Sequence, residues 1–189
     1  MNCPCLWAIF AIKKMKRSII FASMAIASGL TLANVYNSIV DVPAWSNQVP
    51  GSIDTARQYF KVSNPGDFFR VFSPLNQALG LVALLLFWKR SSKVRWLLVS
   101  ALVLYVIGEG LTFMYFYPRN DIMFFSNTAN VETLRNTLNE WRSMNWVRSM
   151  VIAAGVICSA TALHFTYFPQ ATRISGATSV RREKQAVSI

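Results

Sequence analysis

The order of hydrophobic and polar positions along this chain divides it into four long apolar blocks separated by polar segments. The blocks cover residues 18–40, 72–88, 96–117 and 146–168. Each is about long enough for a helix to cross a bilayer core of about 30 Å, although the second is near the short limit. The pattern predicts an all-α protein: a four-helix transmembrane bundle with up-down topology.

The two longer polar segments contain signals for helices of their own. Ser52 is a good N-cap, so we expect a short helix over Ser52–Val62. Asn64-Pro65-Gly66 predicts a turn before the second span. Pro118 follows the third span, and the loop after it is expected to run to about Asn130. From Val131 to Phe168 there is no proline, which predicts one long helix whose first part stands outside the membrane.

These elements define three regions of the chain. Residues 1–17 form a basic N-terminal segment, residues 18–168 the membrane domain, and residues 169–189 a polar, basic tail that we expect to be disordered. Met15-Lys16-Arg17 followed by an apolar run is also a natural beginning for an N-terminal span. Met15 is therefore an alternative start to Met1.

Composition and charge support this organisation. The chain is 53% hydrophobic and only 14% charged, well below the ~25% charged residues of soluble domains. Its net charge of +11 resides in segments 13–17, 89–95 and 173–184, because acids and bases balance elsewhere. These segments flank the spans on one side only, so the positive-inside rule places both termini in the cytoplasm. This distribution indicates a lipid bilayer as the partner and argues against nucleic acid.

The supply of metal ligands is small. The chain has three cysteines and one histidine, His164. None of them has metal-ligand spacing, and a haem, di-iron or zinc site built from side chains would need more ligands. We therefore expect no metal site.

One carboxylic acid, Glu109, lies inside the third apolar block. An acid at the centre of a membrane helix costs about 2.5 kcal/mol or more, so its side chain should face the bundle interior or a wet cavity. Each span also brings polar groups to the half of the bundle away from the basic segments, where they must satisfy one another. These groups are Asn34, Asn37 and Asp41; Arg70, Asn76 and Gln77; Tyr117, Arg119, Asn120 and Asp121; and Trp141, Asn145 and Arg148.

Two interpretations fit this polar constellation. It is a hydrogen-bonded network that locks the helices together, or it lines a pocket for a small amphipathic molecule. The aromatic residues around it suit a mostly apolar pocket with a few placed polar groups, and they equally suit an aromatic belt at the membrane interface. Glu109 and Arg148 lie at similar heights on opposed helices, so a pairing between them is predicted.

Several segments occur in the order seen in a known family. They are Asp41-Val42-Pro43, Asn64–Phe69, Ser73–Gln77, Tyr117-Pro118-Arg119-Asn120-Asp121, and Trp141 through Asn145 to Arg148. With these segments, residues 18–168 resemble the anthrone oxygenase-like family of small four-helix membrane proteins. Fungal members of that family are associated with oxidising anthrones to anthraquinones.

The resemblance implies oxygen chemistry without a tightly bound cofactor, on a small aromatic or quinone-like molecule. Such chemistry needs a base and a group that holds the enolate oxygen. Glu109 or Asp121 is the candidate base, and Arg148, Arg119 or Asn145 the candidate oxyanion partner.

Two other functions stay open at this point. A non-enzymatic scaffold or accessory subunit would use the same polar network structurally. A transporter is less well supported, since four spans without an internal repeat make a poor lone transporter. A homo-oligomer, which the sequence leaves open, would revive it.

Overall fold

The protein is described by a computed structural model that covers residues 4–126 and 130–168, with side chains from residue 14 onward. The described part is helical and contains no strand, so the predicted all-α class is confirmed. The elements, in which η denotes a π-helix, are α1 (Pro4–Tyr36), η1 (Asn37–Asp41), α2 (Val42–Ser46), α3 (Gly51–Tyr59), α4 (Pro65–Phe87), α5 (Ser92–Leu111), η2 (Thr112–Phe116), α6 (Tyr117–Asn120), η3 (Asp121–Phe125) and α7 (Val131–Tyr167). The predicted tail, residues 169–189, lies outside the described residues.

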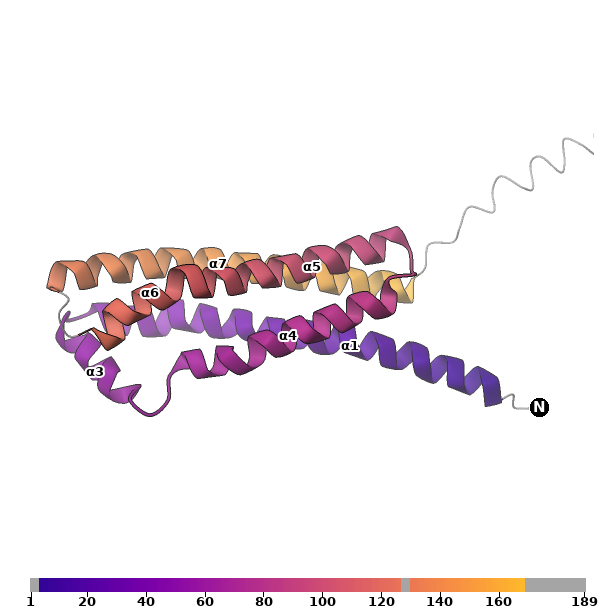
Figure 1. The fold of residues 1–189 in the computed structure, drawn as a ribbon, viewed down its shortest axis with the longest axis horizontal. Helices are drawn as coiled ribbons and strands as arrows, with labels where there is room; N and C mark the ends of the chain where they lie inside the picture. The colour runs from indigo at the N-terminus through magenta and orange to yellow at the C-terminus, as the bar shows by residue number, and fades with distance from the viewer. Residues whose placement is uncertain (1–3, 127–129, 169–189) are drawn as a thin grey trace, which may run out of the picture.

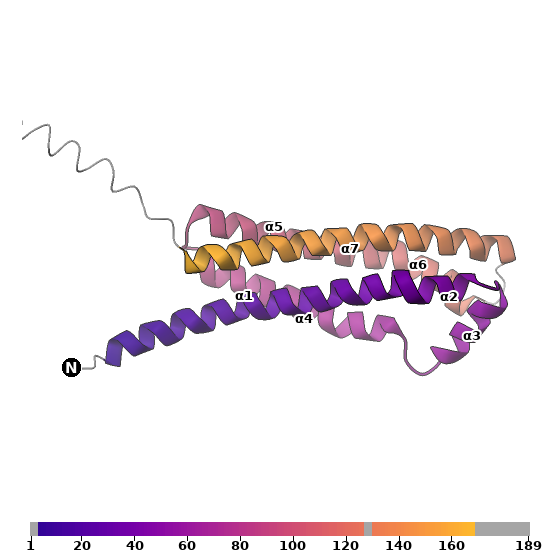
Figure 2. The same cartoon turned by 180° about the vertical axis from the view of Figure 1, so that it is seen from behind.

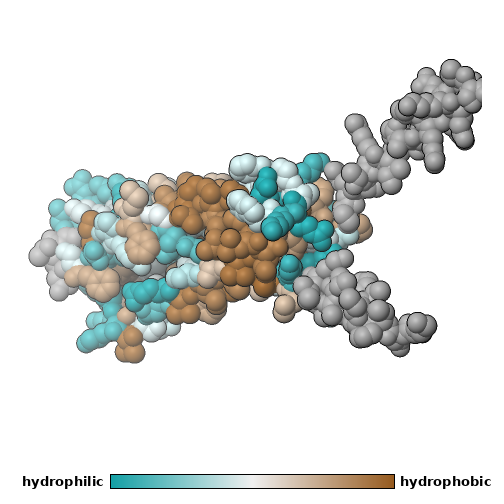
Figure 3. Space-filling view, turned by 45° about the vertical axis from the view of Figure 1, so that its right-hand side comes forward, coloured by the Kyte–Doolittle hydropathy of each residue, from teal (hydrophilic) through white to brown (hydrophobic). Residues whose placement is uncertain are grey.

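Four stretches of the described chain are long and apolar enough to cross a membrane. They are Lys14–Ser46, Pro65–Phe87, Ser92–Phe125 and Val131–Tyr167. Figure 3 shows a hydrophobic band across the middle of the molecule, with more hydrophilic residues on either side of it. The chain is a multi-pass membrane protein, as the four apolar blocks predict.

The four long helices form a ring. Both α1 and α5 pack against α4 and against α7, and successive long helices run in opposite directions (Figures 1 and 2). We call the end with the turn between α4 and α5 the basic end, and the opposite end, with α2, α3, α6 and η3, the loop end. In Figure 1 the first part of α4 diverges from α5 toward the loop end.

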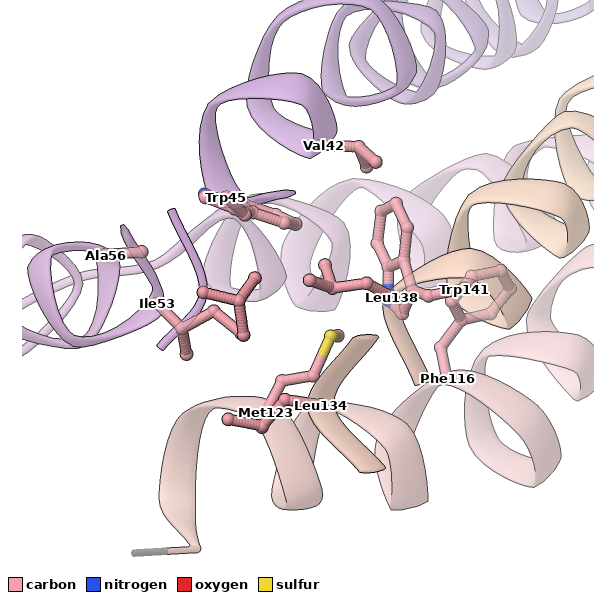
Figure 4. Packing of buried hydrophobic residues seen from close by; sticks show 10 residues of the cluster. Val42, Trp45, Ile53, Ala56, Phe116, Met123, Leu134, Leu138 and Trp141 are labelled. Carbon is pink, nitrogen blue, oxygen red and sulfur yellow. The ribbon is translucent and has the colours of Figure 1, made fainter. Parts of the chain in front are cut away.

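Each end has its own apolar core. The basic-end core packs small and branched side chains from the four long helices, including Ile20, Leu84, Leu98 and Ala162. The loop-end core joins α2, α3, η2, η3 and α7. Its members, nine of which are labelled in Figure 4, are Val42, Trp45, Val49, Ile53, Ala56, Phe116, Met123, Leu134, Leu138 and Trp141. The loop-end core holds the short helices over the polar groups beneath them.

The beginnings of two helices differ from expectation. The prediction that Ser52 caps α3 is wrong: α3 begins one residue earlier, and the Ser52 hydroxyl donates to the Trp45 carbonyl. The turn predicted at Asn64-Pro65-Gly66 instead begins α4. Asn64 Oδ1 accepts from the Gly66 N–H (2.8 Å), and Asp67 Oδ2 accepts from the Asn64 N–H (3.0 Å). This capping box, with proline at the first helical position, begins α4 before the apolar block at residue 72.

The third span continues beyond the position where we expected it to end. The prediction that a loop begins at Pro118 is wrong, because the chain stays helical to Phe125 through η2, α6 and η3. In η2 the Tyr117 N–H bonds the Thr112 carbonyl five residues back. This wider turn leaves room for the ring of Pro118, which in a regular α-helix would clash with the carbonyl four residues before it.

Candidate functional site

The most deeply buried charge in the described bundle is Arg148, on the face of α7 that turns toward α1 and η2. Its side chain is 5% exposed. Nη2 donates to Asn34 Oδ1 (2.7 Å) and Asn145 Oδ1 (2.6 Å), and Nη1 donates to Thr112 Oγ1 (3.2 Å). The guanidinium carbon lies 3.9 Å from the centroid of the Phe116 ring. Neutral oxygens and an aromatic face therefore hold this cation.

The predicted pairing between Glu109 and Arg148 does not form as a direct ion pair. No carboxylate oxygen lies within 4.0 Å of a guanidinium nitrogen of Arg148 in the described part. The half-buried Glu109 carboxyl group is instead hydrogen-bonded with the Ser73 hydroxyl of α4, and it interacts with Arg148 only through the longer-range electrostatic field. The reason is geometric: Asn34, Asn145 and Thr112 already surround the guanidinium.

A side-chain network ties α7 to α1 next to this cation. Asn145 Nδ2 donates to the Asn34 carbonyl (2.8 Å) and to Ser38 Oγ (2.7 Å). Two buried donors of the same cluster, Asn34 Nδ2 and Arg148 Nε, have no partner. A buried donor without a partner costs about 1–3 kcal/mol, so the cluster retains hydrogen-bonding capacity that the protein itself does not use.

Two cavities meet at Glu109 and Arg148. The larger, of about 300 Å³, reaches toward the loop end and is lined by Asn37, Trp45, Arg57, Phe60, Lys61, Asn64, Pro65, Gly66, Phe69, Arg70, Glu109, Thr112, Phe116, Tyr117, Asn120, Phe124, Phe125, Trp141 and Arg148. The smaller, of about 20 Å³, has room for a water molecule. It is lined by Leu30, Asn34, Phe69, Ser73, Asn76, Gln77, Tyr105, Gly108, Glu109, Thr112, Arg148 and Ile152.

Most residues that the sequence singled out line one of these cavities. The larger one includes Asn37, Arg70, Glu109, Tyr117, Asn120, Trp141 and Arg148. The smaller one adds Asn34, Asn76 and Gln77.

Four predicted residues lie outside both cavities. Asn145 acts on the site through its bond to Arg148. Asp41 accepts from the Asn37 amide (2.9 Å) when that amide is oriented with its nitrogen toward the two acceptors around it. Arg119 binds Glu140 of α7 (2.7 Å) and stacks on Tyr115. Asp121 is exposed on η3. Asp121 is therefore a poorer candidate for a base than Glu109.

Several residues that line the larger cavity were not predicted from the sequence. Thr112 and Phe116 follow Glu109 at spacings of three and seven residues. This spacing places them on the same helix face as Glu109, so both could have been predicted from the sequence. Arg57, Lys61 and Phe124 come from the loop segments, whose path over the cavity is a tertiary feature.

The charges around the larger cavity are mostly positive. Glu109 is its one acid, against Arg57, Lys61, Arg70 and Arg148. Arg57 and Arg70 are each bound to an aspartate within their own helix. Among the residues that the structure describes, no three His, Cys, Asp or Glu side chains come together as metal ligands would.

Fold and site together define a four-span membrane protein with a polar cluster and an aromatic-lined cavity in one half of the bundle. The sequence model of the family described as anthrone oxygenase matches residues 68–158. This stretch includes most of α4, all of α5 to η3 and more than half of α7. Over these residues, just under half of the chain, the protein is similar to the anthrone oxygenase family. No curated protein and no solved structure is significantly similar to it.

Proposed function

We propose that the larger cavity binds a small, mostly apolar aromatic molecule through an oxygen atom that carries negative charge. The observation behind this proposal is Arg148: a guanidinium with no carboxylate within 4.0 Å and an unpartnered Nε, at a cavity of about 300 Å³. A buried cation is costly unless it is paired. The surrounding rings of Phe69, Phe116 and Trp141 suit a flat apolar ligand.

The chemistry we propose is oxygenation without a bound cofactor. Glu109 removes a proton from the ring methylene that lies opposite the carbonyl of an anthrone-like substrate, and Arg148 stabilises the resulting enolate oxygen. The electron-rich carbanion donates electrons to O₂ and forms a carbon–oxygen bond. The peroxide then loses water, so that one anthrone and one O₂ give one anthraquinone and one H₂O. Both side chains line the same cavity, as this step requires.

Oxygen uptake tests this step. The purified chain in nanodiscs is mixed with anthrone, and O₂ consumption is measured against empty nanodiscs to correct for spontaneous oxidation. Glu109→Gln should lower the protein-dependent rate at least about 100-fold, the lower end of the usual range for a general base. Glu132→Gln, an exposed acid at the start of α7, is the matched control and should leave the rate unchanged.

Asp121→Asn separates the two candidate bases. Because Asp121 lies outside both cavities, this variant should keep its turnover. Loss of turnover in Asp121→Asn but not in Glu109→Gln would transfer the role of base to Asp121. A wild-type rate no higher than that of empty nanodiscs would contradict the oxygenase proposal.

A second candidate function is a non-enzymatic scaffold or accessory subunit. The bonds from Asn145 to α1 and from Arg148 to α1 and η2 favour it, because they join three elements as a structural lock would. The two functions differ in ligand binding. A scaffold should show no saturable binding of 1-anilinonaphthalene-8-sulfonate (ANS), an anionic aromatic probe. The proposed pocket should bind ANS, and the Arg148→Met variant should no longer bind it.

The orientation in the membrane belongs to the same proposal. Lys14, Lys16, Arg17 and the 89–95 turn lie at the basic end, so we place this end and both termini in the cytoplasm. The loop end is then extracytoplasmic. Cysteines introduced at Ser91 and at Asn47 test this: a membrane-impermeant thiol reagent added to intact cells should label only position 47.

A further inference from the structure

We infer that the larger cavity opens sideways into the extracytoplasmic leaflet, and that its ligand enters from the lipid as an anionic amphiphile. This inference rests on the proposed function, because it concerns how the ligand of that pocket arrives. The mouth is defined by the three exposed residues of the cavity lining: Lys61 before α4, Arg70 in α4 and Phe125 in η3. The buried lining residues, Arg148 among them, lie at its inner part.

The height of the mouth relative to the bilayer supports entry from the lipid. Arg70, Glu109 and Arg148 lie 17, 17 and 19 residues from the basic ends of their helices. At about 1.5 Å per residue, all three are about 26–29 Å from the basic end. The hydrocarbon core is about 30 Å thick, so the mouth lies at its extracytoplasmic boundary, where lipid head groups begin.

The surface around the mouth changes character at this height. Just beyond Arg70 on α4, Val71 (62% exposed), Phe72 and Leu75 are apolar and exposed, as lipid-facing residues are. On the other side, Lys61 and Ser63 are exposed and polar, and the exposed Val62 lies between them. The mouth therefore has hydrocarbon on one side and head groups on the other. The arrangement of the helices agrees, since the first part of α4 diverges from α5 in this region (Figure 1).

The charges at the mouth favour an anionic ligand. Lys61 and Arg70 lie at the rim, and Arg148 lies farther inside. Arg70 is bound to Asp67 (2.9 Å), whereas Lys61 makes no ion pair within the described chain. An amphiphile with one anionic oxygen group meets a cation at the head-group level first and the Arg148 guanidinium afterwards. A neutral analogue gains nothing from either.

Two fluorescent probes that share one ring system test the entry route and the charge preference separately. ANS carries a sulfonate, and N-phenyl-1-naphthylamine (NPN) is its neutral relative. Both are given to the full chain in phosphatidylcholine vesicles, and binding is followed by energy transfer from the tryptophans, two of which line the cavity. Entry from the lipid predicts that the association rate of NPN follows its mole fraction in the bilayer. A rate that follows the aqueous concentration instead would overturn the route.

Blocking the mouth provides the second measurement. In a background with all cysteines changed to serine, Phe125→Cys is labelled with N-(1-pyrenyl)maleimide, and Ile39→Cys, an exposed position on η1, is the control. The bulky label at position 125 should slow NPN association at least about tenfold, and the label at position 39 should not change it. Equal rates for the two labelled variants would exclude this mouth as the entrance.

The charge preference has its own matched pair. Lys61→Gln should slow ANS association about threefold and leave NPN unchanged, because electrostatic attraction accelerates only the charged ligand. Arg142→Gln removes a cation of the loop end that lies outside the cavity, and should leave both rates unchanged. Equal slowing of ANS by both variants would show general attraction rather than recognition at the mouth.

The equilibrium signal separates the two levels of the proposal. If NPN binding is saturable but its association rate does not change when the mouth is blocked, only the proposed route is wrong. No saturable binding of either probe overturns the pocket itself, and the route with it.

Discussion

The two halves of this bundle solve the same problem, the packing of four helices in lipid, in different ways. The basic-end half joins its helices through close apolar contacts such as those of Ile20, Leu84 and Ala162. The loop-end half also has an apolar core, but it adds amides and a buried guanidinium that join its helices, and it contains the larger cavity. Its helices also contain the π-helical segments of the described chain. Such segments occur often at functional sites.

This difference between the two halves shows that the helices pack less closely in the loop-end half. Small residues allow close approach in the basic-end half and the middle of the bundle, and packing is the main source of helix association in membranes. The loop-end half has a cavity where packing would otherwise be, together with polar groups that are costly in lipid. A purely structural lock would not need the empty volume. The following predictions test this contrast, in order of decreasing effect on stability.

The largest effect is expected for Asn145→Leu. This change removes the donor to the Asn34 carbonyl and Ser38, and one acceptor of Arg148. Each polar group left buried without a partner costs about 1–3 kcal/mol, so we expect a loss of about 3 kcal/mol in the free energy of unfolding. SDS titration in mixed micelles measures it.

Asn139→Leu is the control for this prediction. Asn139 lies on the same helix with an exposed side chain, and its replacement should change stability by less than about 0.5 kcal/mol. Similar losses in both variants would mean that the network contributes nothing specific.

The second prediction concerns the close packing of α5 on α7. A Cβ atom at Gly155 would lie 2.6 Å from the ring of Tyr105, which is buried and bonded to Ser159 (3.0 Å). Gly155→Ala should therefore destabilise the protein by about 2 kcal/mol, as overpacking typically does.

Gly29→Ala is the matched control, because nothing lies within 4 Å of its Cβ position. It should be neutral or stabilise the helix by up to about 1 kcal/mol. If Gly155→Ala is equally harmless in the same SDS titration, the contact between α5 and α7 is looser than described.

The third prediction tests how the loop-end core holds the cavity wall. Trp141 Nε1 donates to Asn120 Oδ1 (2.9 Å) and so links α7 to α6. Trp141→Phe keeps an aromatic ring but removes this bond, and should cost about 1 kcal/mol. Combined with Asn120→Ala, the double variant should lose less stability than the sum of the two single losses, because the bond is lost only once. Strict additivity in the double-mutant cycle would show that the bond does not form.

The smallest effect is expected at the surface of the loop end. Arg119 pairs with Glu140 at 2.7 Å, but the carboxylate side chain is 54% exposed. Glu140→Gln should cost about 0.5 kcal/mol, because exposed ion pairs contribute little. Since salt screens such pairs, the difference from wild type should shrink between 0.05 and 0.5 M NaCl, concentrations chosen to span about 14 to 4 Å of screening length. A salt-independent difference would point to packing instead.

Much of the fold was predictable from periodicity and charge alone. The four apolar blocks identify the four candidate spans, and the absence of proline between residues 131 and 168 predicts α7 as one helix. Such features are local, because a run of apolar side chains has one low-energy state in lipid. Helix ends were less predictable. Ser52 and Pro118 carry strong signals, yet caps and π-turns depend on which backbone groups find partners nearby.

The gathering of polar groups in one half of the bundle follows from the amino-acid sequence alone, because each span carries them at the same height. Which of these groups meet depends on the way the helices pack. Arg148 lies among Asn34, Asn145 and Thr112 rather than against Glu109, because hydrogen-bond partners in a bundle are chosen by helix rotation and side-chain reach. The cavity is likewise a tertiary product, since its walls come from segments that are far apart in the chain.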